Sequence, residues 1–304
     1  NYKLMLVITS DEDKARNMCD DAAFFNGEAL YYPAKDAIFY SADVTGNQIT
    51  GQRLKCISRL IEHIKAVDSK DGQDGGLLTL VTTIDGVSDR LVPLKRYMES
   101  VITIDSTSEI DTEKLAKKMV QMGFTRTGMV EDKGQFSIRG GIIDIFSYTD
   151  EAPVRIELWD TEVDSIRMFD AESQRSIEKL KSYHIFPATE FLFTEEEKQA
   201  GLDKIRKERD EQLECFDYGK RKRTQEQIEA GNNINKLVGD VERTGNYAKF
   251  LDTIVKETAG LIEYFPVEDT LIVLDEPNRL KECNELTLYE YGESMKNRLA
   301  AGYV

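Results

Sequence analysis

The amino-acid sequence predicts an α/β protein in which a parallel-sheet domain is split by an inserted β-rich α+β domain. Continuous apolar runs near the start (Leu4 to Ile8) and near the end (Thr270 to Leu274) are typical of strands buried on both faces of a parallel sheet. Between them, short alternating segments follow one another with tight turns, as in an antiparallel meander. The expected domain ranges are 1–106 and 193–304 for the two parts of the α/β domain and 107–192 for the insert.

The first part of the chain alternates strand-like and helix-like segments. After the strand at 4–8, Asp11 can cap a helix in which Ala15, Met18, Cys19 and Ala22 recur at helical spacing. A second helix is expected at 52–65, then a strand at 77–81 and a short strand at 101–104. This alternation predicts a parallel sheet.

The middle of the chain changes to β structure after a helix that starts behind Asp111 and ends at Gly123. The expected strands are 124–130, 135–139, 142–146, 154–159 and 165–169. From about residue 194 the chain becomes charged and helical, at 198–214 and 220–230. It then returns to α/β structure with a strand at 270–274 and a helix whose first turn holds Pro277.

The charge balance argues against a protein that binds nucleic acid by itself. The chain has 40 Lys and Arg against 56 Asp and Glu, a net charge of -16, so its field repels phosphates. Its apolar runs are far shorter than the ~20 residues of a membrane span, and its four cysteines lack metal spacing, so we expect a cytoplasmic location and no metal. Since the chain starts without Met and directly before a strand, we expect it to be part of a longer polypeptide.

The most informative segment is a hairpin with Gly140-Gly141 at its turn. If Arg139 pairs with Ile142, one face of the hairpin is wholly apolar and forms core. The other face then carries guanidinium, carboxylate and large apolar groups: Arg139 with Ile142, Ser137 with Asp144, and Gln135 with Phe146. Such a mixture suits a protein-binding hot spot, but it is also compatible with an ordinary solvated sheet face on which a neighbour covers Phe146.

Residues 134–146 (GQFSIRGGIIDIF) and 154–170 (VRIELWDTEVDSIRMFD), followed by Ser173-Gln174-Arg175-Ser176, closely resemble the UvrB-homology region of the bacterial transcription-repair coupling factors (Mfd). The resemblance implies a degenerate RecA/helicase-like α/β domain split by an insert that binds the repair protein UvrA. It also implies that this part of the protein is not catalytic, whereas the parent is an ATP-dependent DNA translocase that contacts RNA polymerase.

The resemblance also implies which residues contact UvrA. Arg139 matches the family's hairpin arginine, Phe146 its strand-ending phenylalanine, and Arg126 a basic residue just upstream, whereas Ser137 departs from UvrB. Together with the mixed hairpin face, the expected UvrA-binding residues are Arg126, Gln135, Ser137, Arg139, Ile142, Asp144 and Phe146. The alternative is that Arg126 and Arg139 form ion pairs within the sheet, with Asp144 or Glu157.

Two further motifs have a competing structural interpretation. Asp275-Glu276 ends a strand in the manner of a Walker B motif, but no G-x-x-x-x-G-K-[ST] phosphate loop occurs in the 304 residues, so we expect a vestigial acid pair and no cofactor. The basic run Lys220 to Arg223 could contact DNA or an acidic partner, but a solvated helix face is the simpler explanation.

Three functions are compatible with these patterns. The leading hypothesis is a non-enzymatic module that recruits UvrA to stalled RNA polymerase. The second is the front part of a UvrB-like DNA-dependent ATPase whose phosphate loop precedes residue 1. In the third, the hairpin face docks on the parent's own motor and restrains it.

Overall fold

A parallel sheet joins the two ends of the chain. The computed structural model describes residues 2–35, 44–68, 76–216, 224–244, 247, 250–255 and 257–302. Its four-stranded sheet has the order β14 (Thr270–Leu274), β1 (Leu4–Thr9), β3 (Leu78–Thr83) and β2 (Glu28–Tyr32). Because β1 pairs in parallel with both β3 and β14, the first and last parts of the chain share one sheet, as predicted.

Helices cover the two faces of this sheet. α1 (Glu12–Asn26) starts as predicted, since a side-chain oxygen of Asp11 accepts the backbone N–H of Lys14 at 2.8 Å. α1 packs on Val7 and Val81, whereas α2 (Val44–Asp68) packs on the other face of β1, which presents Leu4, Leu6 and Ile8. Short elements complete the domain: α3 (Ile84–Ser88), α4 (Leu94–Ser100), α8 (Leu251–Ile254), the 3-10 helix Leu261–Tyr264, and β4 (Arg90–Leu91) paired with β13 (Ala259–Gly260).

The insert is built on a six-stranded sheet. Its order is β11 (Ser176–Lys179), β10 (Glu162–Phe169), β9 (Val154–Trp159), β8 (Ile142–Phe146), β7 (Gln135–Arg139) and β6 (Thr125–Arg126). α5 (Thr112–Gln121) is capped by Asp111, and its Leu115 and Met119 pack on this sheet. Gly123 follows the helix with a φ of 88°, which agrees with the prediction that the helix ends at this glycine.

Two predicted strands behave differently in the structure. The strand expected at 124–130 shrinks to the two residues of β6, which pair in parallel with β7, because the following residues leave the sheet. The short strand expected at 101–104 in the parallel sheet is β5 (Ile102–Asp105), which instead pairs with β12 (Ser182–Ile185) in an antiparallel ribbon.

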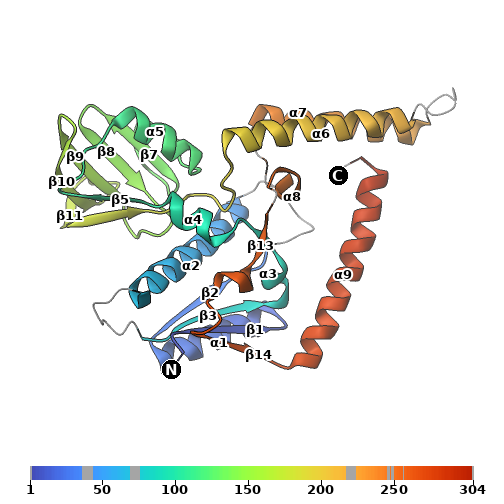
Figure 1. Cartoon of the computed structure of the whole chain (residues 1–304), viewed down its shortest axis with the longest axis horizontal. Helices are drawn as coiled ribbons and strands as arrows, with labels where there is room; N and C mark the ends of the chain where they lie inside the picture. Colours follow the sequence, from blue (N-terminus) through green and yellow to red (C-terminus); the bar gives the residue numbers. More distant parts are fainter. Residues whose placement is uncertain are drawn as a thin grey trace.

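Three long helices follow the insert in the sequence. α6 (Glu195–Phe216) and α7 (Gln225–Thr244) run side by side and project from the body, and α9 (Pro277–Ala300) starts at Pro277 as predicted (Figure 1). The basic run 220–223 lies outside the described residues. Across the described ranges, no helix is long and apolar enough to span a membrane.

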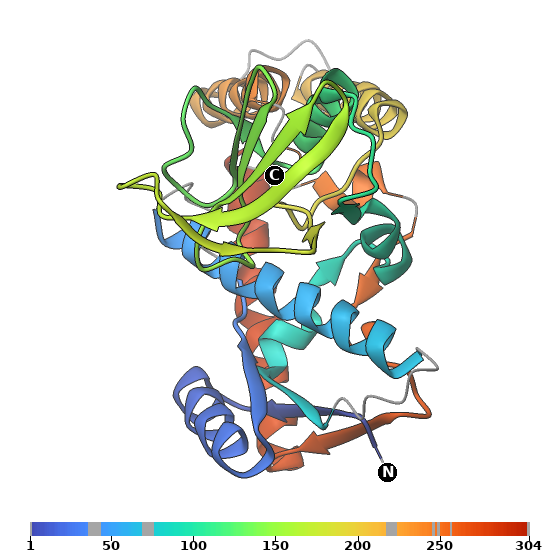
Figure 2. The same cartoon turned by 90° about the vertical axis from the view of Figure 1, so that its left-hand side faces the viewer.

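α2 lies between the insert and the parallel sheet (Figure 2), and a buried ion pair fixes it there. Arg53 of α2 has no exposed side-chain surface and donates to Glu190, at the end of the insert, at 2.5 Å. The same guanidinium donates to Asp89 at 2.6 Å and to the carbonyl of Pro33 at 2.8 Å, and it stacks 4.2 Å from the ring centre of Tyr32.

The charges in this cluster depend on one another. Burial by itself raises the pKa of the Glu190 carboxyl, but the nearby cations Arg53 and Lys35 outweigh it and hold the pKa below the ordinary value. Glu190 therefore stays ionised although its side chain is 1% exposed. The pair joins the end of the insert to a residue of α2 that lies 137 positions earlier in the sequence.

We expect Glu190→Gln to lower the free energy of unfolding by about 3 kcal/mol, because it leaves the guanidinium of Arg53 buried with too little negative charge. Urea denaturation followed by circular dichroism measures this change. Glu151→Gln is the control, since its ion pair with Lys55 is exposed and is expected to contribute less than about 1 kcal/mol. Equal losses in the two variants would contradict a special role for the buried pair.

Candidate partner-binding site

The hairpin of β7 and β8 has the predicted register. Arg139 pairs with Ile142, Ser137 with Asp144, and Gln135 with Phe146. On the apolar face, Phe136, Ile143 and Ile145 have no exposed surface and belong to the core of the insert. We call the opposite face, with its continuation on β9 to β11, the hairpin face.

The hairpin face is less open than its residue types suggest. Ser137 and Asp144, both predicted to contact a partner, are each 1% exposed. The loop that follows β6 covers Ser137, whose hydroxyl donates to the carbonyl of Gly128 at 3.0 Å. The side-chain oxygen of Gln135 holds the same loop, because it accepts the backbone N–H groups of residues 131 and 132 at 3.0 and 3.1 Å. In the described structure Ser137 and Gln135 therefore hold this loop, and burial takes Ser137 away from direct contact.

Asp144 is shared between two arginines. It accepts Arg139 Nη2 at 2.7 Å, and Arg155 Nε and Nη2 at 2.6 and 2.9 Å. Arg155 is held further by Gln174 at 2.7 Å and by the ring of Phe169, whose centre lies 4.2 Å from the guanidinium carbon. Hydrogen bonding to Asp144 raises the pKa of Arg155. One carboxylate thus faces two guanidiniums, and one positive charge remains uncompensated.

Arg139 is compatible with both roles that the sequence left open, an ion pair within the sheet and a contact with a partner. It forms the ion pair within the sheet, yet 46% of its side chain remains exposed and can bind a second carboxylate. Beside it, Ile142 and Phe146 are half-buried, and Lys133 Nζ lies 5.6 Å from the ring centre of Phe146. Arg139, Ile142 and Phe146 therefore share one accessible face of the sheet.

Arg126 is separated from this group. It is exposed and forms no ion pair among the described residues. Its parallel pairing with Phe136 places it on the side of the sheet that carries the apolar core residues, at the edge strand β6. Arg126 and Arg139 therefore do not lie on the same sheet face.

The predicted partner-binding residues do not include one exposed residue of this region. Trp159, at the end of β9, is 80% exposed. Extending the alternation from the predicted hairpin to the next strand would have identified it, because residues 155, 157 and 159 share a face.

The predicted acid pair already has an internal counter-ion. Asp275 and Glu276 follow β14 at the carboxyl end of the parallel sheet, where α/β proteins usually bind ligands. Lys14 of α1 lies 2.6 Å from Asp275 and 2.9 Å from Glu276, and the hydroxyl of Thr9 donates to Asp275 at 2.9 Å. Hydrogen bonding to Lys14 lowers the pKa of Asp275. The acid pair thus forms a tie between α1 and the start of α9.

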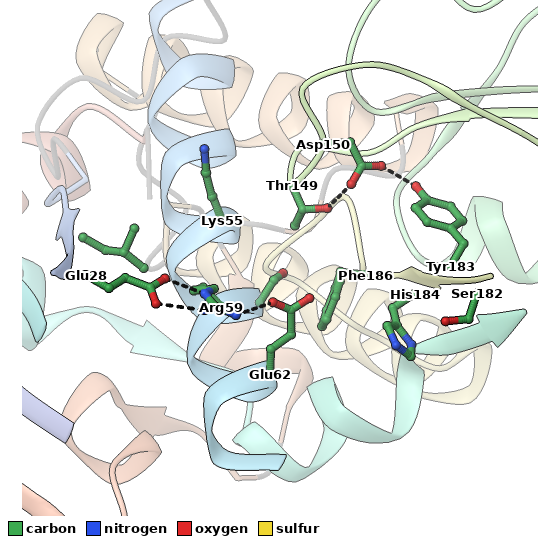
Figure 3. A pocket seen from close by; sticks show the side chains of 12 residues that line it. Glu28, Lys55, Arg59, Glu62, Thr149, Asp150, Ser182, Tyr183, His184 and Phe186 are labelled. Carbon is green, nitrogen blue, oxygen red and sulfur yellow. Dashed lines mark hydrogen bonds and ion pairs between the residues drawn. The ribbon is translucent and has the colours of Figure 1, made fainter. Parts of the chain in front are cut away.

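A cleft of about 400 Å³ lies between α2 and the insert (Figure 3). On the α2 wall, Arg59 binds Glu28 at 2.5 and 2.8 Å and Glu62 at 3.1 Å. On the insert wall, Asp150 accepts the hydroxyl of Tyr183 at 2.5 Å. These charged groups satisfy one another within each wall, which favours a structural role at the junction. Within the described ranges, no group of three or more His, Cys, Asp or Glu side chains could hold a metal ion.

Burial raises the pKa of the Asp150 carboxyl, although hydrogen bonds from Tyr183 and Thr149 oppose the rise. The folded state therefore binds this proton more tightly than the unfolded chain, and stability decreases as the pH rises from the ordinary aspartate range near pH 4 through the raised pKa. We expect Asp150→Asn to gain stability relative to the parent over this interval. Unfolding free energies at pH 4 to 7 measure the difference, and a difference independent of pH would contradict it.

Asp144→Ala is expected to lower the unfolding free energy by about 3 kcal/mol, because two guanidiniums lose their buried partner. Arg139→Ala is expected to cost less than about 1 kcal/mol, since its side chain is half exposed and Arg155 still neutralises Asp144. Urea denaturation of both variants tests this order of effects. A larger loss for Arg139→Ala would show that Arg139 primarily stabilises the fold.

Two comparisons relate this chain to known proteins. Residues 102–191 match the family model of the UvrB interaction domain. The whole chain is similar to transcription-repair coupling factors: 32% identical over 99% of this chain to that of Bacillus subtilis (strain 168), and 28% identical over 99% to those of Staphylococcus aureus (strain Mu50) and Staphylococcus haemolyticus.

This chain spans about a quarter of the length of those relatives, at 25%, 24% and 25% respectively. The resemblance found in the sequence is confirmed. Residues 102–191 match the model of the UvrB interaction domain, within a chain that is similar along almost its entire length to bacterial transcription-repair coupling factors.

Proposed function

We propose that this chain is a protein-binding module of a transcription-repair coupling factor, which recruits the nucleotide excision repair protein UvrA to RNA polymerase stalled at a lesion in the bacterial cytoplasm. The insert makes the contact through its hairpin face. The observation that carries the proposal is the sharing of Asp144 by Arg139 and Arg155, which leaves Arg139 half exposed beside Ile142.

Physical chemistry favours this arrangement for protein recognition. A guanidinium that is already oriented by a buried carboxylate loses little side-chain entropy on binding, and its remaining N–H groups can still donate to a carboxylate of the partner. Half-buried apolar neighbours, here Ile142 and Phe146, release water when they are covered. Asp144 and Arg155 then act as positioning residues for Arg139.

The α/β part fits a supporting role. We propose that its parallel sheet is a degenerate RecA-like domain without catalysis or cofactor in this part of the protein. Lys14 supports this proposal, because its ammonium lies between Asp275 and Glu276, at the carboxyl ends of the strands, and competes with a divalent cation there. The rest of the parent chain, including a translocase motor, is proposed to supply the ATP-dependent steps.

The test is calorimetric titration of this chain with UvrA from the same organism. We expect binding by the parent and at least about 30-fold weaker binding by Arg139→Ala, since truncation of a central interface arginine costs about 2 kcal/mol or more. Phe146→Ala is expected to weaken binding in the same direction.

The control is Arg206→Ala, because Arg206 of α6 is also ion-paired and has a similar exposed fraction, 42% against 46%. Thermal melting checks that all variants remain folded. Absence of binding by the folded parent would contradict UvrA recruitment. It would then favour docking of the hairpin face on the parent's motor.

A further inference from the structure

The single tryptophan of the chain lies exposed at one end of the hairpin face. Trp159 ends β9 and is 80% exposed, next to the turn at Asp160, whose φ is 59°. Along β9, Val154 and Ile156 are buried in the core of the insert. The alternation of a strand therefore places Trp159 on the opposite side, away from the core.

Strand pairing brings Trp159 into the same surface as Arg139. Arg139 pairs with Ile142, and Ile142 pairs with Glu157, so these three residues share a face. Trp159 lies two residues beyond Glu157, beside the glycine turn, about 8 Å from Ile142 by strand geometry. Phe146 lies at the other end of β8, so the hairpin face extends about 20 Å between two aromatic side chains.

The charges on the strands of the hairpin face define the kind of partner. Paired positions across the strands place four cations on the hairpin face, against three carboxylates. The cations are Arg139, Arg155, Arg167 and Lys179, and the carboxylates are Asp144, Glu157 and Glu162. The strand positions thus carry one surplus positive charge, which lies on the side of Arg139 and Arg155, whereas Trp159 itself pairs with Glu162; the whole chain has a net charge of -16.

Glu157 does not cancel the exposed charge of Arg139. It is engaged by Arg167 at 2.6 and 2.8 Å and by the hydroxyl of Ser165 at 2.7 Å. The surface that complements this face therefore has an apolar pocket for a large aromatic ring and carboxylates at its edge.

We propose that Trp159 is the aromatic anchor of the partner contact, and that it inserts into an apolar pocket of UvrA whose rim carries carboxylates for Arg139. This inference rests on the proposed function and extends it to a residue outside the hairpin. An aromatic side chain of this size buries about 150 to 250 Å² at low cost in side-chain entropy, and tryptophan is among the residue types enriched in binding hot spots. Without a partner, the same ring leaves most of its surface in water.

Binding affinity is measured by calorimetry with UvrA for the parent, Trp159→Ala and Trp159→Phe. We expect at least about 30-fold weaker binding for Trp159→Ala, which corresponds to about 2 kcal/mol, and a much smaller loss for Trp159→Phe, which keeps a ring. Phe25→Ala is the matched control, because Phe25 of α1 is an aromatic residue exposed to 78% outside the insert. It is expected to bind like the parent.

A second readout uses 5-fluorotryptophan incorporated into this chain. Because the chain has one tryptophan, fluorine NMR shows one resonance, and unlabelled UvrA contributes none. We expect this resonance to shift and broaden when UvrA is added. Thermal melting should show no loss of stability for Trp159→Ala, since the side chain makes few contacts in the free protein.

The outcomes separate this inference from the function on which it rests. If Arg139→Ala weakens binding while Trp159→Ala binds like the parent and the fluorine resonance broadens without a change of chemical shift, the role of Trp159 is overturned and UvrA recruitment stands. If the folded parent does not bind UvrA, the proposed function is overturned, and the inference with it. Weaker binding by Trp159→Ala with a shifted resonance supports both.

Discussion

The buried ion pair between Arg53 and Glu190 is the constraint on which the arrangement of the two parts depends. Arg53 lies in a helix of the α/β part, and Glu190 lies where the chain leaves the insert, so the pair fixes the insert at its exit. Taking both charges out of water is costly, and the cost is offset only because Asp89, Lys35 and the carbonyl of Pro33 complete the cluster. Such a cluster has few alternative geometries, which makes the junction specific.

The same principle operates on a smaller scale in the insert. Asp144 is a buried carboxylate with two guanidiniums, and each of its oxygens is engaged. In the first cluster the cation is fully enclosed and the result is structural. In the second, Arg139 reaches the surface, so the surplus positive charge is available to another molecule. Burial, rather than residue type, therefore decides that Arg53 has a structural role and that Arg139 can bind another molecule.

In the hairpin, the sequence was sufficient to predict the strand register but not the exposure of the residues. Its register followed from Gly140-Gly141 and from the alternation of apolar residues, because a shift by one residue would have turned every core side chain to solvent. The exposure of its other face could not be predicted. Ser137 is covered by a loop that the sequence suggested as a strand, and Arg126 lies on the other side of the sheet because it pairs with the core residue Phe136.

By itself, the sequence determined many of the helices and strands, the parallel sheet shared by the two ends of the chain, the register of the hairpin and the family resemblance. Each of these depends on periodicity or on residues close together in the chain, which local patterns record. Only the tertiary structure decided which polar groups meet, such as Lys14 with Asp275 or Arg53 with Glu190. These contacts join residues that are distant in sequence, and their energies depend on burial, which exists only once the chain has folded.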